Sequence, residues 1–245
     1  MKANGRKIAL VTGANKGIGY EIARGLAKKG MLVLLGCRDM GRAETAIEKL
    51  AKEGYTAVAP ILVDLTRPET IAEAASQIDS AHGHLDVLVN NAGIAVEWQS
   101  KPSNVDLALV KQVYETNVFG TMAVIQAMLP LLLRSDAGRI VNVSSSLGSL
   151  CLTSDPAGPL SQFLLLGYNT SKTALNAVTV QFANELRGTP VKVNAVCPGY
   201  VATDMNRHSG PRTPEQGAAI AIRMATIADD GPTGGYFNDE GRVPW

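Results

Sequence analysis

Apolar runs of strand length alternate with longer segments of helical period along the whole chain, and this alternation strongly limits the possible folds. The runs lack polar alternation, which is typical of strands in a parallel sheet that is buried on both faces. The segment 18–30 has helical spacing and closes on Gly30, a common helix-ending residue. The strand candidates are 8-IALV, 32-LVLLG, 57-AVAPILV, 85-LDVLV, 139-RIVNVS and 191-VKVNAV, and the further helix candidates are 41–53, 68–81, 105–134 and 168–187.

This order of elements predicts an α/β fold, in which one doubly wound domain spans residues 1–245. We expect a mostly parallel sheet of about seven strands with helices on both faces. The 245 residues are 46% hydrophobic, enough for a sizeable core. Two long connections, 146–167 and 200–213, follow strands and should lie at the carboxyl edge of the sheet, where ligands bind in such folds. The second connection could form a lid.

The net charge limits the kinds of partner that we expect, and the cysteine content indicates the cellular compartment. A net charge of +1 gives no indication of nucleic acid or a membrane surface, so a small molecule is the expected partner. Three widely spaced cysteines argue against a disulfide framework and predict a cytoplasmic protein. The N-terminal apolar run is too short for a signal peptide. With three histidines and no cysteine cluster, no metal site is predicted.

A glycine cluster, 12-TGANKGIG-19, stands between the first predicted strand and the first helix. Glycines there let backbone amides approach a pyrophosphate, and the helix N-terminus adds partial positive charge. Three glycines alone would be weak evidence in a chain with 24 of them. Their position between strand and helix predicts a dinucleotide-binding turn.

Further motifs follow in a fixed order: 90-NNAG-93, 116-TNVFG-120, 142-NVSSS-146, 168-YNTSK-172 and 198-PG-199, with Thr203 after the last. Together with TGANKGIG they make the chain resemble the short-chain dehydrogenase/reductase family over nearly its whole length. The resemblance implies a Rossmann-type domain and a nicotinamide cofactor. The cofactor contacts it implies are Gly13, Asn15, Lys16, Gly17, Ile18, Gly19, Arg38, Asp64, Leu65, Asn91, Ala92, Gly93, Tyr168, Lys172, Pro198, Gly199, Val201 and Thr203.

The end of the second strand, 34-LLGCRD-39, bears on the choice between NADP and NAD. An acid there would bind the free ribose hydroxyl of NAD and repel the 2′-phosphate of NADP. That position is the neutral Cys37, and Arg38 and Lys16 could clamp a phosphate. We therefore predict NADP (NADPH) over NAD, although Asp39 would become the ribose-binding acid if the register shifted by two.

Tyr168 and Lys172 are four residues apart and share one helix face. An ammonium near the phenol would lower its pKa by roughly 1–3 units, although such pairs are also common on helix surfaces. The resemblance implies that Tyr168 exchanges a proton with the substrate and that Lys172 binds the nicotinamide ribose. It implies that Ser145 binds the substrate oxygen, with Ser144 and Ser146 as alternatives. It also implies that the backbone carbonyl of Asn117, at a helix break, holds a water in a proton relay.

The long 146–167 connection and the ending 231–245 are similar to the carbonyl reductase branch of the family, which implies a monomer or a homodimer. Residues 163–166 could wall a substrate pocket or pack on the core, and Trp98, Tyr200 and Met205 are further candidates for its walls. The absence of a charge cluster predicts an uncharged ketone or aldehyde, reduced by NADPH. The alternatives are a 3-oxoacyl reductase acting on a carrier protein and a non-catalytic, dinucleotide-binding regulatory protein.

Overall fold

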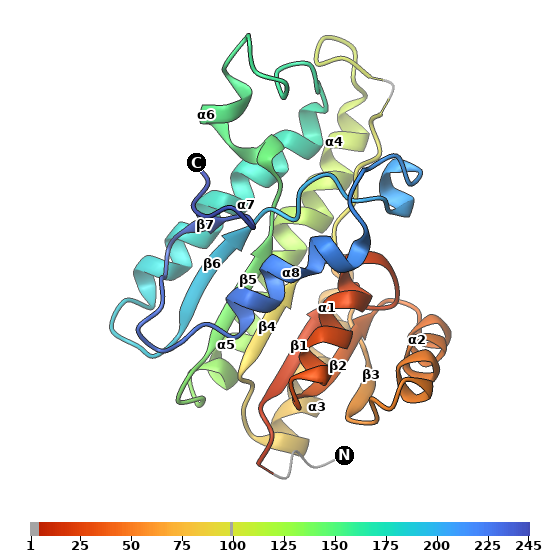
Figure 1. Ribbon diagram of the computed structural model, residues 1–245, viewed down its shortest axis with the longest axis vertical. Helices are drawn as coiled ribbons and strands as arrows, with labels where there is room; N and C mark the ends of the chain where they lie inside the picture. Colours follow the sequence, from red (N-terminus) through yellow and green to blue (C-terminus); the bar gives the residue numbers. More distant parts are fainter. Residues whose placement is uncertain (1–4, 99) are drawn as a thin grey trace.

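A computed structural model of the protein describes residues 5–98 and 100–245. Seven parallel strands form one sheet in the order β3-β2-β1-β4-β5-β6-β7 (Figure 1). The predicted doubly wound α/β fold is therefore confirmed. The strands are β1 (Ile8–Thr12), β2 (Leu32–Cys37), β3 (Val58–Leu62), β4 (Val87–Asn90), β5 (Arg139–Val143), β6 (Lys192–Val196) and β7 (Tyr236–Phe237).

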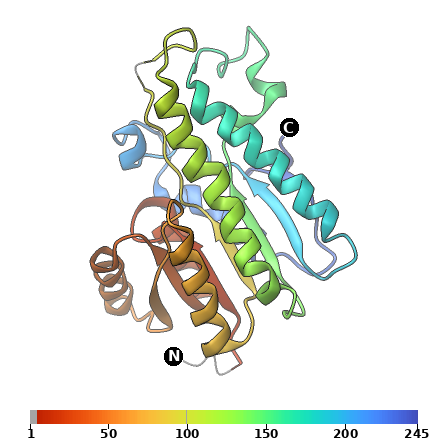
Figure 2. The same ribbon diagram turned by 180° about the vertical axis from the view of Figure 1, so that it is seen from behind.

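Helices cover both faces of the sheet, as Figures 1 and 2 show from opposite sides. Strand residues alternate between two cores: Ala9 and Val11 pack with one set of helices, Ile8 and Leu10 with the other. The first set is α1 (Gly17–Lys28), α2 (Met40–Lys52) and α8 (Pro214–Ala225). The second includes α3 (Pro68–His82), α5 (Thr121–Leu132) and α7 (Leu166–Glu185), with α4 (Leu107–Tyr114) beside α7.

The single helix predicted for 105–134 is interrupted by a π-helical turn, η1 (Glu115–Gly120), between α4 and α5. The break falls at Asn117 and Gly120, where the sequence predicted it. A Cβ at Gly120 would lie 2.4 Å from the Leu65 carbonyl oxygen, so only glycine allows this close approach. The wider turn holds Asn117, which is fully buried, beneath the carboxyl edge of the sheet.

The strand order reverses between β1 and β4, and such a point marks the ligand crevice of an open α/β sheet. Both long connections follow strands of the second half of the sheet. The first contains the short turns η2 (Ser146–Gly148) and α6 (Leu150–Thr153), and the second contains η3 (Asp204–Asn206). Among the described residues, no helix is both long and apolar enough to span a membrane.

Candidate active site

The glycine turn forms a cradle at the start of α1. Gly13 and Gly17 have φ of 65° and 57°, in the left-handed region that favours glycine. A Cβ on Gly19 would lie 2.3 Å from the Gly13 carbonyl oxygen. Lys16, the N-cap residue, makes no side-chain cap, so the first amides of α1 are left for an external acceptor. This backbone fits a dinucleotide pyrophosphate.

The loop after β4 closes the cradle from the opposite side. Asn91 donates from Nδ2 to the carbonyl oxygens of Thr12 (3.0 Å) and Gly13 (3.3 Å). A Cβ on Gly13 would lie 3.1 Å from Cα of Ala92. Asn91 and Ala92 therefore shape the turn, and the adjoining Gly93 lies where an added Cβ would be 3.5 Å from Nζ of Lys172.

At the end of β2, no acidic side chain is available to bind a ribose hydroxyl of the cofactor. Burial raises the pKa of the Cys37 thiol to about 11, so the group is neutral where a ribose-binding carboxylate would stand. Asp39 caps α2, accepting the Arg42 backbone amide at 3.1 Å, and pairs with the Arg42 guanidinium at 3.3 Å. Arg38 is exposed and pairs with no acidic side chain in the part of the chain that the structure describes.

Lys16 and Asp64, two other residues predicted to contact the cofactor, already interact with other side chains of the protein. Lys16 forms an ion pair with Asp204, in the 200–213 connection, which the sequence did not suggest. Asp64 accepts hydrogen bonds from Thr66, at 3.0 Å from the backbone amide and 2.8 Å from the hydroxyl. Leu65 is buried in the core. Thr203 lies near the glycine turn, because a Cβ on Gly17 would be 3.7 Å from its methyl group.

Tyr168 and Lys172 occupy one face of α7, with Nζ 5.8 Å from the centre of the tyrosine ring. Nζ donates to the Val143 carbonyl at 2.9 Å, and burial lowers the pKa of Lys172 to about 8. Burial raises the pKa of Tyr168 to about 12, against a smaller lowering by a hydrogen bond with Ser145. Lys172 is not among the causes of this shift, so the expected lowering of the phenol pKa by the ammonium is not seen here; burial, which disfavours the charged phenolate, is the largest cause.

The three consecutive serines have different surroundings. Ser144 is buried and donates to Oδ1 of Asn176 at 2.6 Å. Ser145 lies beside the Tyr168 side chain, whose pKa it lowers, and its Oγ accepts the Leu147 amide at 3.2 Å. Ser146 opens the η2 turn, and its amide donates to Sγ of Cys197 at 3.2 Å. Of the three serines, Ser145 is the one that acts on the phenol.

The Asn117 side chain connects the π-helical turn with the loop after β4 and with α7. Its Oδ1 accepts the Ile94 amide at 2.8 Å, and Nδ2 donates to the Ile94 carbonyl at 2.9 Å and to Oγ of Ser171 at 3.1 Å. The side chain thus fixes the loop after β4 against α7. The water-relay role of its backbone carbonyl stays a prediction.

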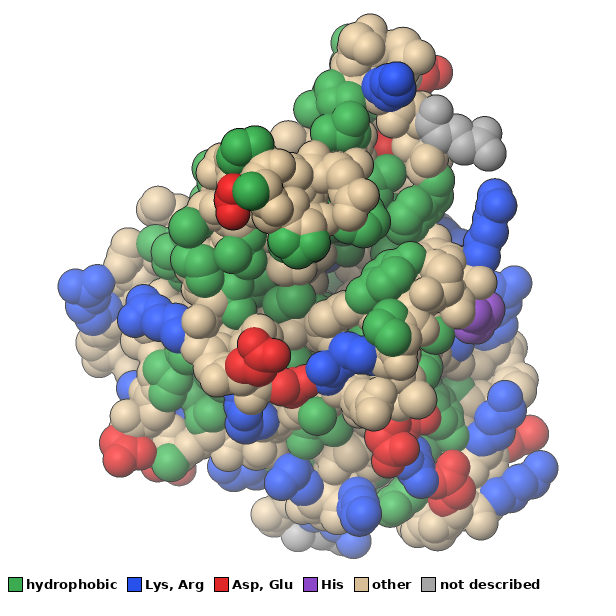
Figure 3. All heavy atoms as spheres, turned by 45° about the horizontal axis from the view of Figure 1, so that its top comes forward, with side chains coloured by type: hydrophobic (Ala, Val, Ile, Leu, Met, Phe, Trp, Pro, Cys, Tyr) green, Lys and Arg blue, Asp and Glu red, His purple; other side chains and the backbone are tan. Residues whose placement is uncertain are grey.

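Apolar side chains surround the entrance to this region. Figure 3 looks onto this end of the molecule and shows hydrophobic side chains around a hollow. Leu165 is buried and Leu166 half-buried, so residues 163–166 divide between core and surface. The exposed large apolar residues on the segments that follow β4, β5 and β6 are Val96, Trp98, Leu150, Phe163, Leu164, Tyr200 and Met205.

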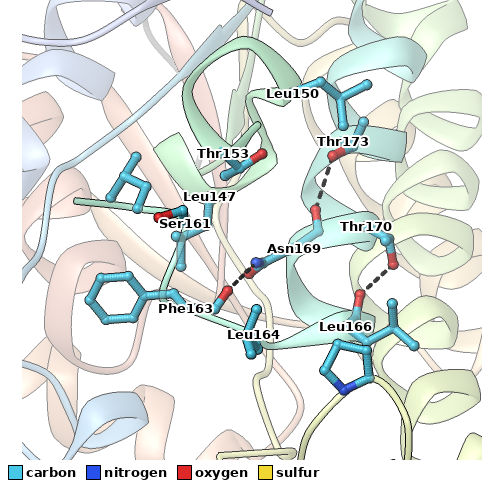
Figure 4. Close-up of a pocket in the computed structure, with 12 residues that line it drawn as sticks. Leu147, Leu150, Thr153, Ser161, Phe163, Leu164, Leu166, Asn169, Thr170 and Thr173 are labelled. Atoms are coloured by element: carbon cyan, nitrogen blue, oxygen red, sulfur yellow. Dashed lines mark hydrogen bonds between the residues drawn. The ribbon is translucent and has the colours of Figure 1, made fainter. Parts of the chain in front are cut away.

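A separate pocket of about 220 Å³ lies between α7 and the 146–167 connection (Figure 4). Its walls include Phe163 and Leu164 from the connection, and Asn169 and Thr173 from α7. At 3.6 residues per turn these two α7 positions lie to one side of the face that carries Tyr168. The residues that line this pocket include neither Tyr168, Ser145 nor Lys172, so it does not contain the reacting centre.

Three residues of this region were not predicted: Glu97, Asn176 and Asp204. Asn176 bridges the Ser144 hydroxyl and the Gly148 carbonyl (3.1 Å), which ties the Ser145 loop to α7. Glu97 is the only acid in the apolar stretch 94-IAVEW-98, a signal that could have identified it. Asp204 had no such signal, because its partner Lys16 is 188 positions away.

The fold and this site are those of a dinucleotide-dependent oxidoreductase, and comparisons with known proteins agree. Residues 7–213 match the short chain dehydrogenase family, and the chain belongs to this family. Salutaridine reductase of Papaver somniferum is 34% identical, over 95% of this chain and 94% of the relative. Carbonyl reductase (NADPH) 1 of Mus musculus is 33% identical, over 99% and 100%. A solved structure of a Shigella flexneri short chain dehydrogenase complexed with NADP is 28% identical, with a TM-score of 0.84 over 97% of this chain and 98% of that one.

Proposed function

We propose that the protein is an NADPH-dependent reductase that converts an uncharged ketone or aldehyde to an alcohol. The observation that carries this proposal is the convergence of Tyr168, Ser145 and Lys172 at the carboxyl edge of the sheet. The glycine cradle opens at the same edge. Bound NADPH would lie along the cradle and supply the hydride.

The residues have separate roles in this reaction. Ser145 and Tyr168 hydrogen-bond the substrate carbonyl oxygen, and Tyr168 gives it a proton as negative charge develops there. A phenol with a pKa raised to about 12 is protonated at neutral pH, which suits a proton donor. Lys172 holds the nicotinamide ribose, and Asn117 keeps the loop after β4 against α7.

Several features support NADPH as the cofactor. The neutral Cys37 thiol offers a ribose hydroxyl no carboxylate, and Asp39 is engaged in capping α2. We expect the exposed Arg38 to receive a 2′-phosphate, with Lys16 as a second cation. The mouse relative is named for NADPH, and the Shigella structure contains NADP.

The substrate class follows from the apolar entrance. Trp98, Phe163 and Met205 offer dispersion contacts to an uncharged carbonyl compound. The relatives named salutaridine reductase and carbonyl reductase are consistent with this class.

A panel of ketones and aldehydes, assayed with NADPH and NADH in parallel, tests the proposal. Tyr168→Phe should lower kcat by about 10²–10⁴-fold, the usual contribution of a positioned acid. The matched control is Tyr55→Phe, which removes a hydroxyl just before β3, at the edge of the sheet opposite the carboxyl edge that carries the site. Full activity of Tyr168→Phe, or no turnover of any carbonyl by the unaltered protein, would contradict the assignment.

A further inference from the structure

Glu97 is a carboxylate with 1% of its surface exposed, in the loop that follows β4. None of the roles assigned above uses it. Taking a carboxylate out of water is unfavourable unless hydrogen bonds replace the lost solvation. The role of Glu97 can therefore be inferred from the contacts that its side chain makes.

The carboxylate caps the active-site helix at its catalytic residue. Oε1 of Glu97 accepts the backbone N–H of Tyr168. The N-cap residue of α7 is Leu165, whose side chain cannot accept a hydrogen bond, so the helix provides no cap of its own. A negative charge from another segment also complements the positive end of this 20-residue helix.

Gly167 provides the space for this contact. A Cβ at Gly167 would lie 2.6 Å from Oε2 and 3.1 Å from Oε1 of Glu97. Its φ is outside the left-handed region, so the backbone itself would accept another residue. The absence of a side chain at 167 thus matters because it lets the carboxylate reach the first turn of α7.

Glu97 makes no wider side-chain network. Within residues 5–98 and 100–245, Oε2 has no hydrogen-bond partner. The side-chain hydrogen bond of Glu97 in these residues is the one to Tyr168, so the contact that holds the carboxylate is made at the catalytic residue.

We propose that Glu97 is a positioning residue for the reaction. It fixes the backbone at Tyr168 and thereby the approach of the phenol to Ser145 and to the substrate oxygen. This role rests on the proposed function, because it acts through Tyr168. A small displacement of a catalytic group is enough to slow a reaction strongly.

Three variants test the role: Glu97→Ala, Glu97→Gln and Gly167→Ala. Glu97→Ala should lower kcat by about tenfold or more, with the Kd for NADPH unchanged within about twofold. Glu97→Gln should recover most of the lost kcat, because an amide oxygen can still accept the Tyr168 N–H. Gly167→Ala keeps the carboxylate but excludes it from the helix, so it should lose kcat as Glu97→Ala does.

Hydrogen exchange at the Tyr168 amide, followed by NMR, gives a readout that needs no turnover. Protection should fall in Glu97→Ala and Gly167→Ala and persist in Glu97→Gln. Unchanged kcat in both alanine variants, with only a lower Tm, would reduce Glu97 to a structural cap and overturn the proposal. Glu97→Gln as impaired as Glu97→Ala would also overturn it. An unaltered protein that turns over no carbonyl would instead contradict the proposed function.

Discussion

Among single residues, the buried Lys172 and the half-buried Tyr168 change stability in different pH ranges. Burial lowers the pKa of Lys172 from 10.5 to about 8, so between these values the folded protein binds fewer protons than the unfolded chain. Stability from this group therefore rises with pH across that range. Tyr168 has its pKa raised from 10.0 to about 12, so its contribution falls as pH rises between those values.

Replacing Lys172 by Met shows how much of the pH dependence of the free energy of unfolding comes from this lysine. The free energy of unfolding of the unaltered protein should rise, relative to Lys172→Met, by up to about 3 kcal/mol between pH 7.5 and 10.5. Urea denaturation at both pH values measures this difference. Lys101→Met, at an exposed position, should show no such trend. A pH-independent difference for Lys172→Met would contradict the lowered pKa.

At the scale of elements, an ion pair joins the 200–213 connection to the glycine turn. Asp204 of η3 pairs with Lys16, at the N-cap of α1, and also with Nε2 of His208 at 2.8 Å. Lys16 holds the pKa of Asp204 below its ordinary value. The same lysine is a proposed ligand of the cofactor 2′-phosphate, so Asp204 and the phosphate compete for one cation.

Asp204→Asn should therefore tighten binding of 2′,5′-ADP by about two- to fivefold, the range expected for an exposed ion pair. Binding of AMP, which lacks the 2′-phosphate, should change less. Isothermal titration measures both affinities. In a Lys16→Ala background, Asp204→Asn should have no further effect on 2′,5′-ADP, and an equal gain there would exclude competition for Lys16.

These elements also show how much of the structure could be predicted from the sequence alone. Six strands and the helices α1 to α5 and α7 were predictable because apolar spacing is a local property, as was the helix break at Asn117 and Gly120. The helix α8 was not among the predicted helices. The two-residue strand β7 was not located, since its pairing with β6 depends on tertiary contacts. Ser145 was selected among three serines only by resemblance, whereas its surroundings distinguish it in the structure. Glu97 stands out locally as a lone acid in an apolar stretch, but its contact with Tyr168, like that of Asp204 with Lys16, joins residues distant in the chain and could not be predicted from local pattern.

For the whole molecule, the 146–167 connection determines which surface of α7 is available to another chain. It lies over the first turns of α7, where Asn169 donates to the Phe163 carbonyl at 2.7 Å. Figure 2 shows α4 and α7 side by side on this face of the molecule. Further along α7, the exposed side chains other than Ala177 are polar: Gln181, Asn184 and Glu185. We propose that this surface is unsuited to a helix-packed interface and that the protein is a monomer.

Sedimentation velocity across a hundredfold concentration range should give the mass of one chain throughout. Leu164→Asp places a charge on the exposed apolar rim of the connection and should leave that mass unchanged, because no partner covers the rim. If the connection instead mediated a homodimer, the unaltered protein would sediment as two chains, and this charge would dissociate it. A dimer unaffected by Leu164→Asp would place the interface elsewhere, and the exposed Leu107 and Phe119 on α4 and η1 are then the next apolar positions to test.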